Sequence, residues 1–248
     1  MKKIDGIEYY NASEIAEKFF HKQTEDEIKA LLEEGKINGK KIEDEWYANK
    51  EEIESYIEIF QNEKYFAIGP INIDLTEVKM EGRILDIGGG GEGIIGQFKG
   101  EHVIAIDPSK RELEEAPKSR ALNIIMDAKD LKFLDNAFDS VSAFFTMMYI
   151  PLTDHKKIFL EIYRTLKVGG EFFLWDLKIP KREEDEKEVY LITLKVKFND
   201  KVIDTGYGTK WNKEQDAKYY IKLAKSIGFQ ILEQNVDENI FYLKFKKV

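Results

Sequence analysis

Acidic residues and an unbroken run of glycines share the segment 83–107, and together they indicate a nucleotide-type binding site. Gly88–Gly91 have no Cβ, so the backbone there can adopt positive φ angles and a ligand can approach the main chain closely. The glycines from Gly88 to Gly93 also fit the G-x-G-x-x-G spacing, which is a weak signal on its own. An acid about twenty residues after the first glycine is where a ribose diol binds in such units, and Asp107 occupies that position.

Asp86, two residues before the first glycine, bears on which nucleotide would bind. A dinucleotide would place its pyrophosphate over the glycine turn, where this carboxylate would repel it by a few kcal/mol. S-adenosylmethionine carries no phosphate, and the carboxylate would attract its ammonium and sulfonium groups. Glu92, inside the loop, acts in the same direction. The alternatives are that Asp86 caps nearby loop amides and that the glycine run is only a structural turn.

Strand and helix patterns alternate through the segment that contains these residues. Ser109 predicts the start of a helix that Pro117 ends, and Asp154 predicts the start of a second helix that Gly169-Gly170 closes. This alternation predicts an α/β fold with a doubly wound, mostly parallel sheet. The expected strands are 84–87, 103–106, 123–126, 138–145 and 172–175.

The C-terminal part predicts one more helix and a closing hairpin. We expect the helix to run from Asn212 to Ile227, where Gly228 stops it. The segments 229–234 and 240–245 then predict an antiparallel hairpin that brings the sheet to seven strands.

An insertion at 178–211 precedes this helix. It contains an acidic run, Glu183–Glu188, followed by two alternating stretches joined at Asn199-Asp200, which predict a hairpin. Two interpretations stay open: the hairpin covers an edge or forms a homodimer contact, or it is a wall of an acceptor pocket.

With these elements in place, residues 80–248 resemble the class I S-adenosylmethionine-dependent methyltransferases. One departure concerns the usual D-x-G-x-G-x-G pattern, whose third glycine is replaced by Glu92 between Gly91 and Gly93. The departure affects the expected geometry of the loop more than the assignment. The matching motifs are Ile84–Gly90, Asp107, Met126–Ala128, Phe138–Val141 and Leu166–Gly170.

The resemblance implies S-adenosylmethionine as the cofactor and a Rossmann-like fold. It implies that the first motif lies along the methionine part of the cofactor and that Asp107 holds the ribose hydroxyls. Asp127 and Ala128 would face the adenine edge. The expected cofactor-binding residues are Asp86, Gly88, Gly89, Gly90, Asp107, Pro108, Asp127, Ala128 and Thr146.

Methyl transfer from a sulfonium is an in-line displacement, so the protein mainly has to orient the two reactants. A general base is useful only for an oxygen or a protonated nitrogen acceptor, and the sequence identifies no catalytic residue. Tyr149 is a candidate that could exchange a proton or line the pocket, and Asp176 is a candidate base or loop anchor. His155, near the start of a helix, is expected at the surface or as a helix cap.

Composition excludes several classes of protein. The chain of 248 residues has no cysteine, which excludes disulfides, thiolate metal sites, and the methylation of cytosine C5 or arsenic through a thiolate. Three histidines far apart in sequence predict no metal site. No apolar run approaches the roughly twenty residues of a membrane span, so we expect a cytoplasmic protein. A net charge of −9 without a basic stripe makes nucleic acid an unlikely substrate, which leaves a small-molecule acceptor first and a protein acceptor second.

The first 64 residues predict a separate small domain, with the methyltransferase-like domain at 65–248. Asn11 or Ser13, then Thr24 with Glu27, and then Asn49 predict helix starts, and Asn38-Gly39 predicts the turn of a hairpin. This order resembles excisionase-like or MerR-like winged helix-turn-helix modules, over residues 8–60. The segment holds 10 Lys against 17 Asp plus Glu, so a protein contact or a lid is favoured over DNA binding.

Three functions follow from these observations. We favour a methyltransferase acting on a small molecule. A nicotinamide-dependent oxidoreductase comes second, although the phosphates of the nicotinamide cofactor would have to bind close to the Asp86 carboxylate. The third is a regulator whose first domain binds DNA or protein while the second senses a cofactor.

Overall fold

The protein is described here by a computed structural model that covers residues 1–20, 23–182 and 187–248. The chain divides into two compact units, which are described separately. The first comprises Met1–Ile73, Glu184–Val196 and Gly206–Trp211. The second comprises Asp74–Glu183, Lys197–Thr205 and Asn212–Val248. Much of the insertion at 178–211 therefore groups with the N-terminal residues rather than with the methyltransferase-like part.

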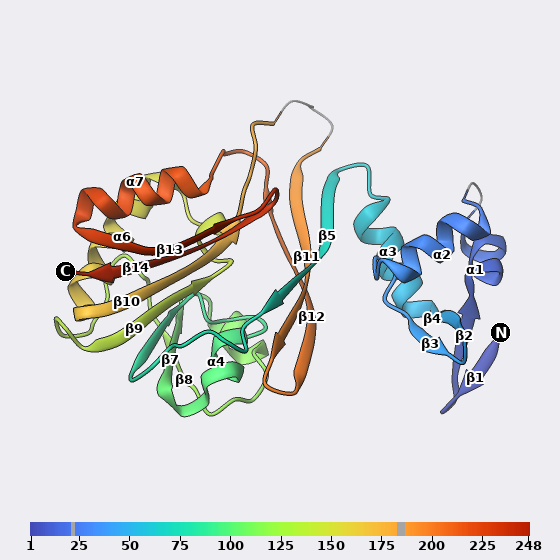
Figure 1. Cartoon of the computed structure of the whole chain (residues 1–248), viewed down its shortest axis with the longest axis horizontal. Helices are drawn as coiled ribbons and strands as arrows, with labels where there is room; N and C mark the ends of the chain where they lie inside the picture. Colours follow the sequence, from blue (N-terminus) through green and yellow to red (C-terminus); the bar gives the residue numbers. More distant parts are fainter. Residues whose placement is uncertain (21–22, 183–186) are drawn as a thin grey trace. The chain divides into compact units, whose positions relative to one another are not determined.

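The second unit is built on a seven-stranded sheet with the strand order β13-β14-β10-β9-β6-β7-β8 (Figure 1). Neighbouring strands from β10 to β8 are parallel, and β14 is antiparallel to both β10 and β13. The predicted doubly wound sheet with a closing antiparallel hairpin is therefore confirmed. The strands are β6 (Ile84–Ile87), β7 (Val103–Asp107), β8 (Leu122–Ile125), β9 (Phe138–Phe144), β10 (Leu166–Leu177), β13 (Phe229–Val236) and β14 (Ile240–Lys247).

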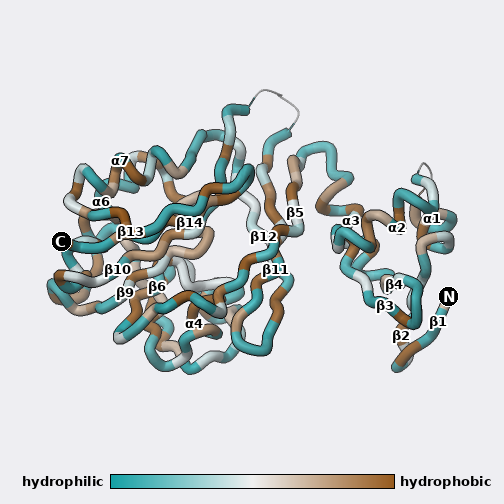
Figure 2. The backbone as a smooth tube through the Cα atoms, in the orientation of Figure 1, coloured by the Kyte–Doolittle hydropathy of each residue, from teal (hydrophilic) through white to brown (hydrophobic). Residues whose placement is uncertain are grey.

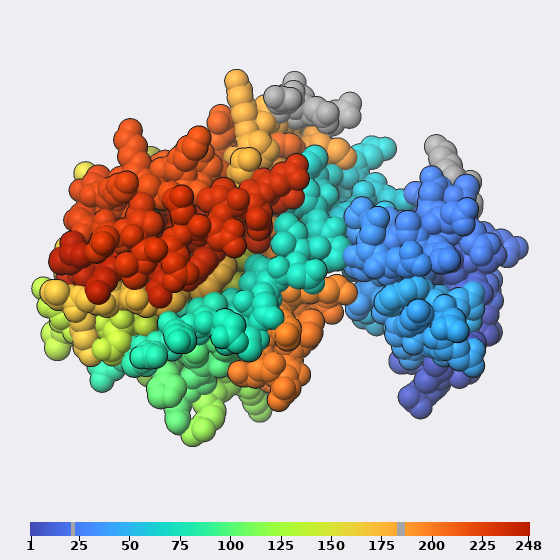
Figure 3. All heavy atoms as spheres, in the orientation of Figure 1, coloured from blue at the N-terminus to red at the C-terminus, as the bar shows by residue number. Residues whose placement is uncertain are grey.

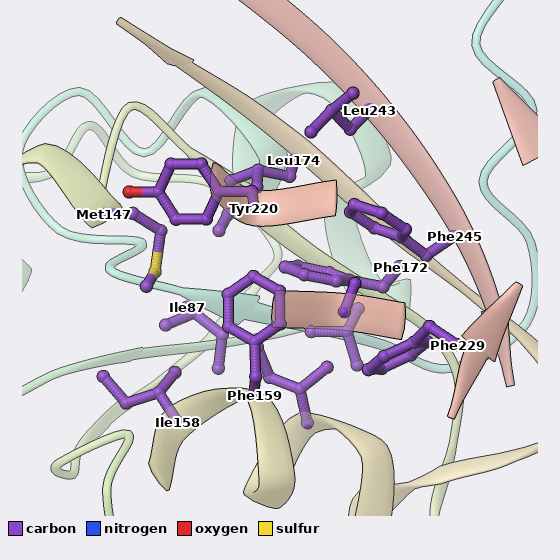
Figure 4. Packing of buried hydrophobic residues seen from close by; sticks show 14 of the residues in the cluster. Ile87, Met147, Ile158, Phe159, Phe172, Leu174, Tyr220, Phe229, Leu243 and Phe245 are labelled. Atoms are coloured by element: carbon purple, nitrogen blue, oxygen red, sulfur yellow. The ribbon is translucent and has the colours of Figure 1, made fainter. Parts of the chain in front are cut away.

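Helices connect these strands and form the core with them. Alternate residues of β10 and β14 meet α6 and α7 in a cluster that includes Phe159, Phe172, Tyr220 and Phe245 (Figure 4). Strands covered on both faces read as continuous apolar runs, which is why the central strands were recognisable in the sequence. The outer strand β13, in contrast, has mostly exposed side chains (Figure 3). The helices are α4 (Ile94–Lys99), α5 (Lys110–Glu115), α6 (Leu152–Thr165) and α7 (Ala217–Ile227), with 3₁₀ turns η1 (Gly100–His102) and η2 (Met147–Tyr149).

Three predicted helix boundaries are wrong. Helix α6 begins at Leu152, with Pro151 rather than Asp154 at the N-cap position; Asp154 lies in the first turn, where an acidic side chain is also favourable and so did not mark the cap. Gly169-Gly170 does not close this helix, which ends at Thr165; the two glycines lie in the irregular first part of β10. Helix α7 begins at Ala217 rather than Asn212, and its N-cap is Asp216, whose side chain accepts a hydrogen bond from a backbone N–H.

A separate three-stranded sheet has the order β12-β11-β5, with β5 (Tyr65–Asp74), β11 (Val189–Phe198) and β12 (Lys201–Lys210). The predicted hairpin is confirmed, with Asn199-Asp200 in its turn and alternating burial along β11. Figure 2 colours the backbone of this hairpin by hydropathy. The acidic run Glu183–Glu188 lies partly outside the described residues.

The segment 65–82 was expected to be a connector, and β5 within it is a correction. A Cβ at Gly69 would lie 2.4 Å from the carbonyl oxygen of Thr193, so a glycine is required where β5 approaches β11. Gly69-Pro70 reads as a turn in sequence, and the partner strand is more than one hundred residues away.

The N-terminal part of the first unit holds three helices and a four-stranded sheet of order β1-β2-β4-β3. The predicted capping box of Thr24 with Glu27 is present at the start of α2, Asn11 caps α1 in a second capping box that was not predicted, and Asn49 caps α3 as predicted. The predicted turn at Asn38-Gly39 is wrong, because the β3–β4 hairpin turns at Glu43-Asp44. The elements are β1 (Lys2–Ile4), β2 (Ile7–Asn11), α1 (Ala12–Phe19), α2 (Glu25–Glu33), β3 (Lys40–Ile42), β4 (Glu45–Asn49) and α3 (Lys50–Phe60).

This part is an internal repeat that the sequence analysis missed. The hairpin and helix β1-β2-α1 correspond without gaps to β3-β4-α3, and β2 pairs with β4 around the symmetric pair Tyr10 and Ala48. The Lys2 ammonium lies 4.9 Å from the centre of the Tyr47 ring, and its counterpart Lys40 lies 3.6 Å from the Tyr9 ring. The two halves are therefore related by an approximate two-fold axis. Identical residues at matching positions are Lys2/Lys40, Lys3/Lys41, Ile4/Ile42, Tyr9/Tyr47, Asn11/Asn49, Glu14/Glu52 and Ile15/Ile53.

The structure selects Asn11 over Ser13 as the cap of α1, and this choice can be tested. Asn11→Ala should lower the local stability of α1 by ~1 kcal/mol, whereas Ser13→Ala should leave it within a few tenths, since only Asn11 accepts the Glu14 N–H. Hydrogen exchange of the α1 amides, measured by NMR, gives both values. Equal losses in the two variants would contradict the assigned cap.

Candidate cofactor and acceptor site

Asp86 is a buried carboxyl group in the middle of the sheet. It lies in β6 opposite Ser142 of β9, and the Ser142 hydroxyl donates to Asp86 Oδ1 at 2.7 Å. The Asp86 side chain is only 2% exposed, and burial raises its pKa to about 7, with the nearby Asp107 carboxylate adding to the rise and the Ser142 hydrogen bond opposing it. Within the residues that the structure describes, no loop N–H bonds to this carboxylate, so the capping interpretation finds no support.

The glycines that follow Asp86 are required by close packing within the protein. Gly88 has a φ of +70°, and a Cβ there would lie 2.3 Å from the Thr146 methyl group. A Cβ at Gly89 would lie 2.6 Å from Asp86 Oδ2 and 2.7 Å from the Ala105 Cβ. Both glycine N–H groups donate to the Ile106 carbonyl oxygen, at 2.8 and 3.0 Å. The turn is thereby fixed directly above the buried carboxylate.

The glycine at position 90 brings the same loop against Asp107. A Cβ there would lie 3.1 Å from Asp107 Oδ2 and 2.6 Å from the Cβ of Glu112. Asp107 is the last residue of β7, and its Oδ1 accepts the Ser109 N–H at 2.7 Å. Burial raises the pKa of Asp107, and the hydrogen bond from Ser109 opposes the rise. The carboxylate is half-buried, so it remains available to donors from solvent or from a ligand.

The departure from the glycine pattern at Glu92 is accommodated by its neighbours. Gly91 and Gly93 both adopt left-handed backbone, with φ of +59° and +54°. Gly93 forms the N-cap of α4. The bend that a third glycine would allow is therefore made on either side of Glu92.

Asp127 and Ala128 follow the end of the neighbouring strand β8. The Met126 N–H donates to the Asp107 carbonyl oxygen at 3.0 Å, which holds this segment beside the end of β7. Ala128 is buried, whereas the Asp127 side chain is about half exposed and its Oδ1 accepts the Lys129 N–H at 2.8 Å. Pro108, directly after Asp107, is exposed.

Thr146 joins the end of β9 to the glycine loop. Its hydroxyl donates to the Ile87 carbonyl oxygen at 3.0 Å, and its methyl group packs where Gly88 lacks a side chain. The turn η2 follows immediately and ends at Tyr149, whose side chain is 52% exposed. This exposure leaves the phenol accessible to a substrate.

Asp176, the second candidate for a catalytic role, is fully buried near the end of β10. Its Oδ2 accepts the Met148 N–H at 3.1 Å, and its Oδ1 accepts the Leu177 N–H at 2.7 Å and the Gln215 side-chain amide at 2.9 Å. Burial raises its pKa to about 7, and these hydrogen bonds and the Lys213 charge oppose the rise. With both oxygens engaged and no exposure, Asp176 has the environment of a loop anchor.

His155 was expected at the surface or as a helix cap, and this prediction is wrong. It is fully buried in the first turn of α6 and stacks on Tyr220 of α7, with ring centres 5.5 Å apart. Its Nε2 lies 3.0 Å from the Ile150 carbonyl oxygen. Burial lowers the pKa of His155 to about 4, so the ring is neutral at pH 7 and Nε2 acts as the donor.

The strand ends thus bring together an arrangement suited to a cationic nucleoside. Asp86, the glycine turn, Asp107 and Thr146 form one continuous set of contacts, and Asp127 with Ala128 follows on the next strand. Over the described ranges, no group of three or more His, Cys, Asp or Glu side chains could hold a metal ion. No helix among the described residues is long and apolar enough to cross a membrane.

Sequence reasoning missed Ser142, which supplies the hydrogen bond to Asp86. A usable signal was present, since Ser140 and Ser142 lie within a mostly apolar strand, and buried hydroxyls must find partners. It also missed Lys213 and Gln215, which lie just before α7 and reach residues of the turn after β9 and of β10.

Comparison with known proteins agrees with this architecture. A family model described as "Methyltransferase domain" matches residues 85–174. The PH0226 protein from Pyrococcus horikoshii has a similar fold, with a TM-score of 0.52 and 19% identity over 70% of this chain and 85% of that one. The second unit therefore has the mostly parallel seven-stranded sheet typical of the Rossmann-like methyltransferase fold, and residues 85–174 match the methyltransferase domain model.

Two curated relatives match part of the chain. Sterol 4-C-methyltransferase strm-1 of Caenorhabditis elegans is 38% identical over 68 residues, which is 27% of this chain and 20% of that protein. Phosphoethanolamine N-methyltransferase 2, from the same organism, is 37% identical over 95 residues, which is 36% of this chain and 21% of that protein. The chain spans about a fifth of the length of these relatives.

The raised pKa of Asp86 predicts a pH-dependent stability. The pKa is about 7 in the folded protein against 3.8 when exposed, so the unfolding free energy falls as pH rises between about 4 and 7. The Asp86→Asn side chain cannot ionise, so the unfolding free energy of this variant should not fall in this way. The unfolding free energy of the variant minus that of wild type should therefore be larger at pH 8 than at pH 5 by roughly 2–3 kcal/mol. Urea denaturation at both pH values measures this gain.

Asp200→Asn, in the exposed turn of the β11–β12 hairpin, is the matched control. The difference between its unfolding free energy and that of wild type should be the same at pH 5 and pH 8. A difference between Asp86→Asn and wild type that did not change with pH would contradict the assigned environment of Asp86.

Proposed function

We propose that the chain is an S-adenosylmethionine-dependent methyltransferase that acts on a small-molecule acceptor. The observation that carries this proposal is the buried Asp86 carboxylate beneath the glycine turn. Burial raises its pKa to about 7, and no cation of the described residues is among the groups that shift it; the ammonium of the methionine part would supply one and favour the ionised form. The match of residues 85–174 to a methyltransferase domain supports the same cofactor.

The remaining residues of the site fit the other parts of this cofactor. The half-buried carboxylate of Asp107 suits the two ribose hydroxyls, which are hydrogen-bond donors. Pro108, Asp127 and Ala128 lie at the two strand ends beyond it, where an adenine ring would extend. The bound cofactor would supply an electrophilic methyl group on sulfur.

The protein's own contribution would be to hold and orient the reactants. Thr146 and η2 flank the glycine turn, so an acceptor approaching the methyl group would pass Tyr149. Tyr149 is suited to line the pocket or to accept a hydrogen bond from the methyl-acceptor molecule. Asp176 is enclosed, so it would act only through the turn that contains Met148. Correct orientation alone can lower the barrier by several kcal/mol.

A small acceptor is supported by the names of the similar proteins, which act on a sterol and on phosphoethanolamine. A nicotinamide-dependent oxidoreductase is disfavoured, because the ligand's pyrophosphate would lie over Asp86. A role in sensing the cofactor without turnover would share the same binding site, and a turnover screen over candidate acceptors separates the two.

Calorimetric titration tests the cofactor assignment directly. S-adenosylhomocysteine should bind the wild-type protein, and NADH should give no measurable heat. Asp107→Asn should weaken S-adenosylhomocysteine binding about 10- to 100-fold, since hydrogen bonds to a charged group contribute about 1.5–3 kcal/mol. Asp200→Asn should bind as wild type does. Tight binding of NADH would refute the proposal.

For the N-terminal part of the first unit, we propose a protein contact rather than DNA binding. The helix that would enter a groove, α2, begins with Glu25, Asp26 and Glu27. The turns of the two related hairpins, Asp5-Gly6 and Glu43-Asp44, are also acidic. Phosphate groups would be repelled at each of these positions.

This proposal predicts weak, non-saturating binding of a fluorescently labelled 20-base-pair duplex. Anisotropy at 50 mM salt should show no saturation below ~100 μM protein, because nonspecific affinity comes from cationic contacts to phosphates. Saturable binding that weakens steeply between 50 and 200 mM salt would show that the module binds DNA.

A further inference from the structure

The turn that follows β9 is fixed by groups from outside it. The Lys213 ammonium donates to the Met147 carbonyl oxygen at 3.0 Å and to the Ile150 carbonyl oxygen at 2.7 Å. The Met148 N–H, which lies between these two carbonyl groups in sequence, donates to Asp176 Oδ2 at 3.1 Å. The turn η2 is therefore bound on its carbonyl side by a cation and on its amide side by a carboxyl group.

Both of these groups are themselves held in place. Asp176 is fully buried and accepts further hydrogen bonds from the Leu177 N–H and the Gln215 side chain. Gln215 also donates to the Leu177 carbonyl oxygen at 2.8 Å and accepts the Tyr220 hydroxyl at 2.9 Å. Donors and acceptors are matched along this chain of bonds, so the network is rigid rather than adaptable.

Keeping the Lys213 ammonium at this position costs desolvation free energy. Burial lowers its pKa to about 8, and the Asp176 carboxyl group opposes that shift. Charged groups are rarely retained in such surroundings without a specific partner. The two carbonyl oxygens at the ends of the turn are the partners that the geometry provides.

The other end of this segment lies against the cofactor loop. Thr146, directly before the turn, donates to the Ile87 carbonyl oxygen and fills the space above Gly88. A shift of the turn would therefore change the distance between the glycine loop and any group bound over Tyr149. In reactions that depend on the orientation of the reactants, a misplacement of about 1 Å can cost on the order of 100-fold in rate.

We propose that Lys213 and Asp176 are positioning residues that hold the turn Met147–Tyr149 in the geometry needed for methyl transfer to the acceptor. Neither group touches the reacting atoms. The inference rests on the proposed function for its catalytic consequence, while the anchoring itself can be measured without it. It also assigns a role to the segment before α7, which carries no recognisable motif.

Hydrogen exchange measured by mass spectrometry tests the anchoring. Lys213→Met keeps most of the aliphatic stem and removes the ammonium, and it should speed exchange in peptides covering 146–150 at least tenfold. Lys213→Arg should restore most of the protection, and Lys218→Met, at an exposed position on α7, should behave as wild type. Asp176→Asn, which preserves shape, should speed exchange at Met148 in the same way if Lys213→Met does not fold.

Enzymatic readouts then separate positioning from general stability. Lys213→Met should bind S-adenosylhomocysteine within threefold of wild type, and its kcat on an acceptor found in the turnover screen should fall by tenfold or more. Lys213→Arg should recover most of this kcat. Unchanged exchange in both Lys213→Met and Asp176→Asn, or an unchanged kcat in Lys213→Met, would overturn the inference. Failure of the wild-type protein to bind S-adenosylhomocysteine would instead refute the proposed function, while the exchange data still report on the anchor.

Discussion

The candidate site of the second unit depends on one carboxyl group, Asp86, buried in β6, an interior strand of the sheet. Asp86 faces Ser142 across the β6–β9 pair, and its pKa rises from 3.8 to about 7 as a result. This rise corresponds to roughly 4 kcal/mol of lost stability above pH 7, a large share of what a domain of this size has. A protein keeps such a group when a bound cation offsets the cost, which is the physical basis for a cationic adenosyl ligand.

The parallel sheet turns this local feature into a site. Each parallel strand delivers its last residues to the same edge, so Asp86, Asp107 and Thr146 meet although they are far apart in sequence. The glycine turn fits between them because the missing side chains at Gly88 and Gly89 are replaced by the Thr146 methyl group and Asp86 itself. The glycines of the turn and the buried Asp86 carboxyl group are thus parts of a single packing arrangement.

Local patterns in the sequence were sufficient for the strands of this sheet and for the caps at Thr24 and Asn49, since these depend on neighbouring residues, whereas they left Asn11 and Ser13 as alternatives for the cap of α1. They were insufficient for β5, whose partner strand is remote and whose Gly69-Pro70 resembles a turn. The burial of His155 and the reach of Lys213 to the turn after β9 likewise depend on how α7 and the segment before it pack. The repeat of β1-β2-α1 in β3-β4-α3 was visible in the sequence but weak, because only scattered residues are identical.

The most direct test of this account is the pKa of Asp86 in the free and the ligand-bound protein, followed through its carboxyl carbon by NMR. We expect a value near 7 in the free protein and a fall of at least two units when S-adenosylmethionine binds, because the ligand's ammonium stabilises the ionised form. An Asp86 that titrates near its ordinary value of 3.8 in the free protein, or whose pKa is unmoved by saturating S-adenosylmethionine, would contradict it.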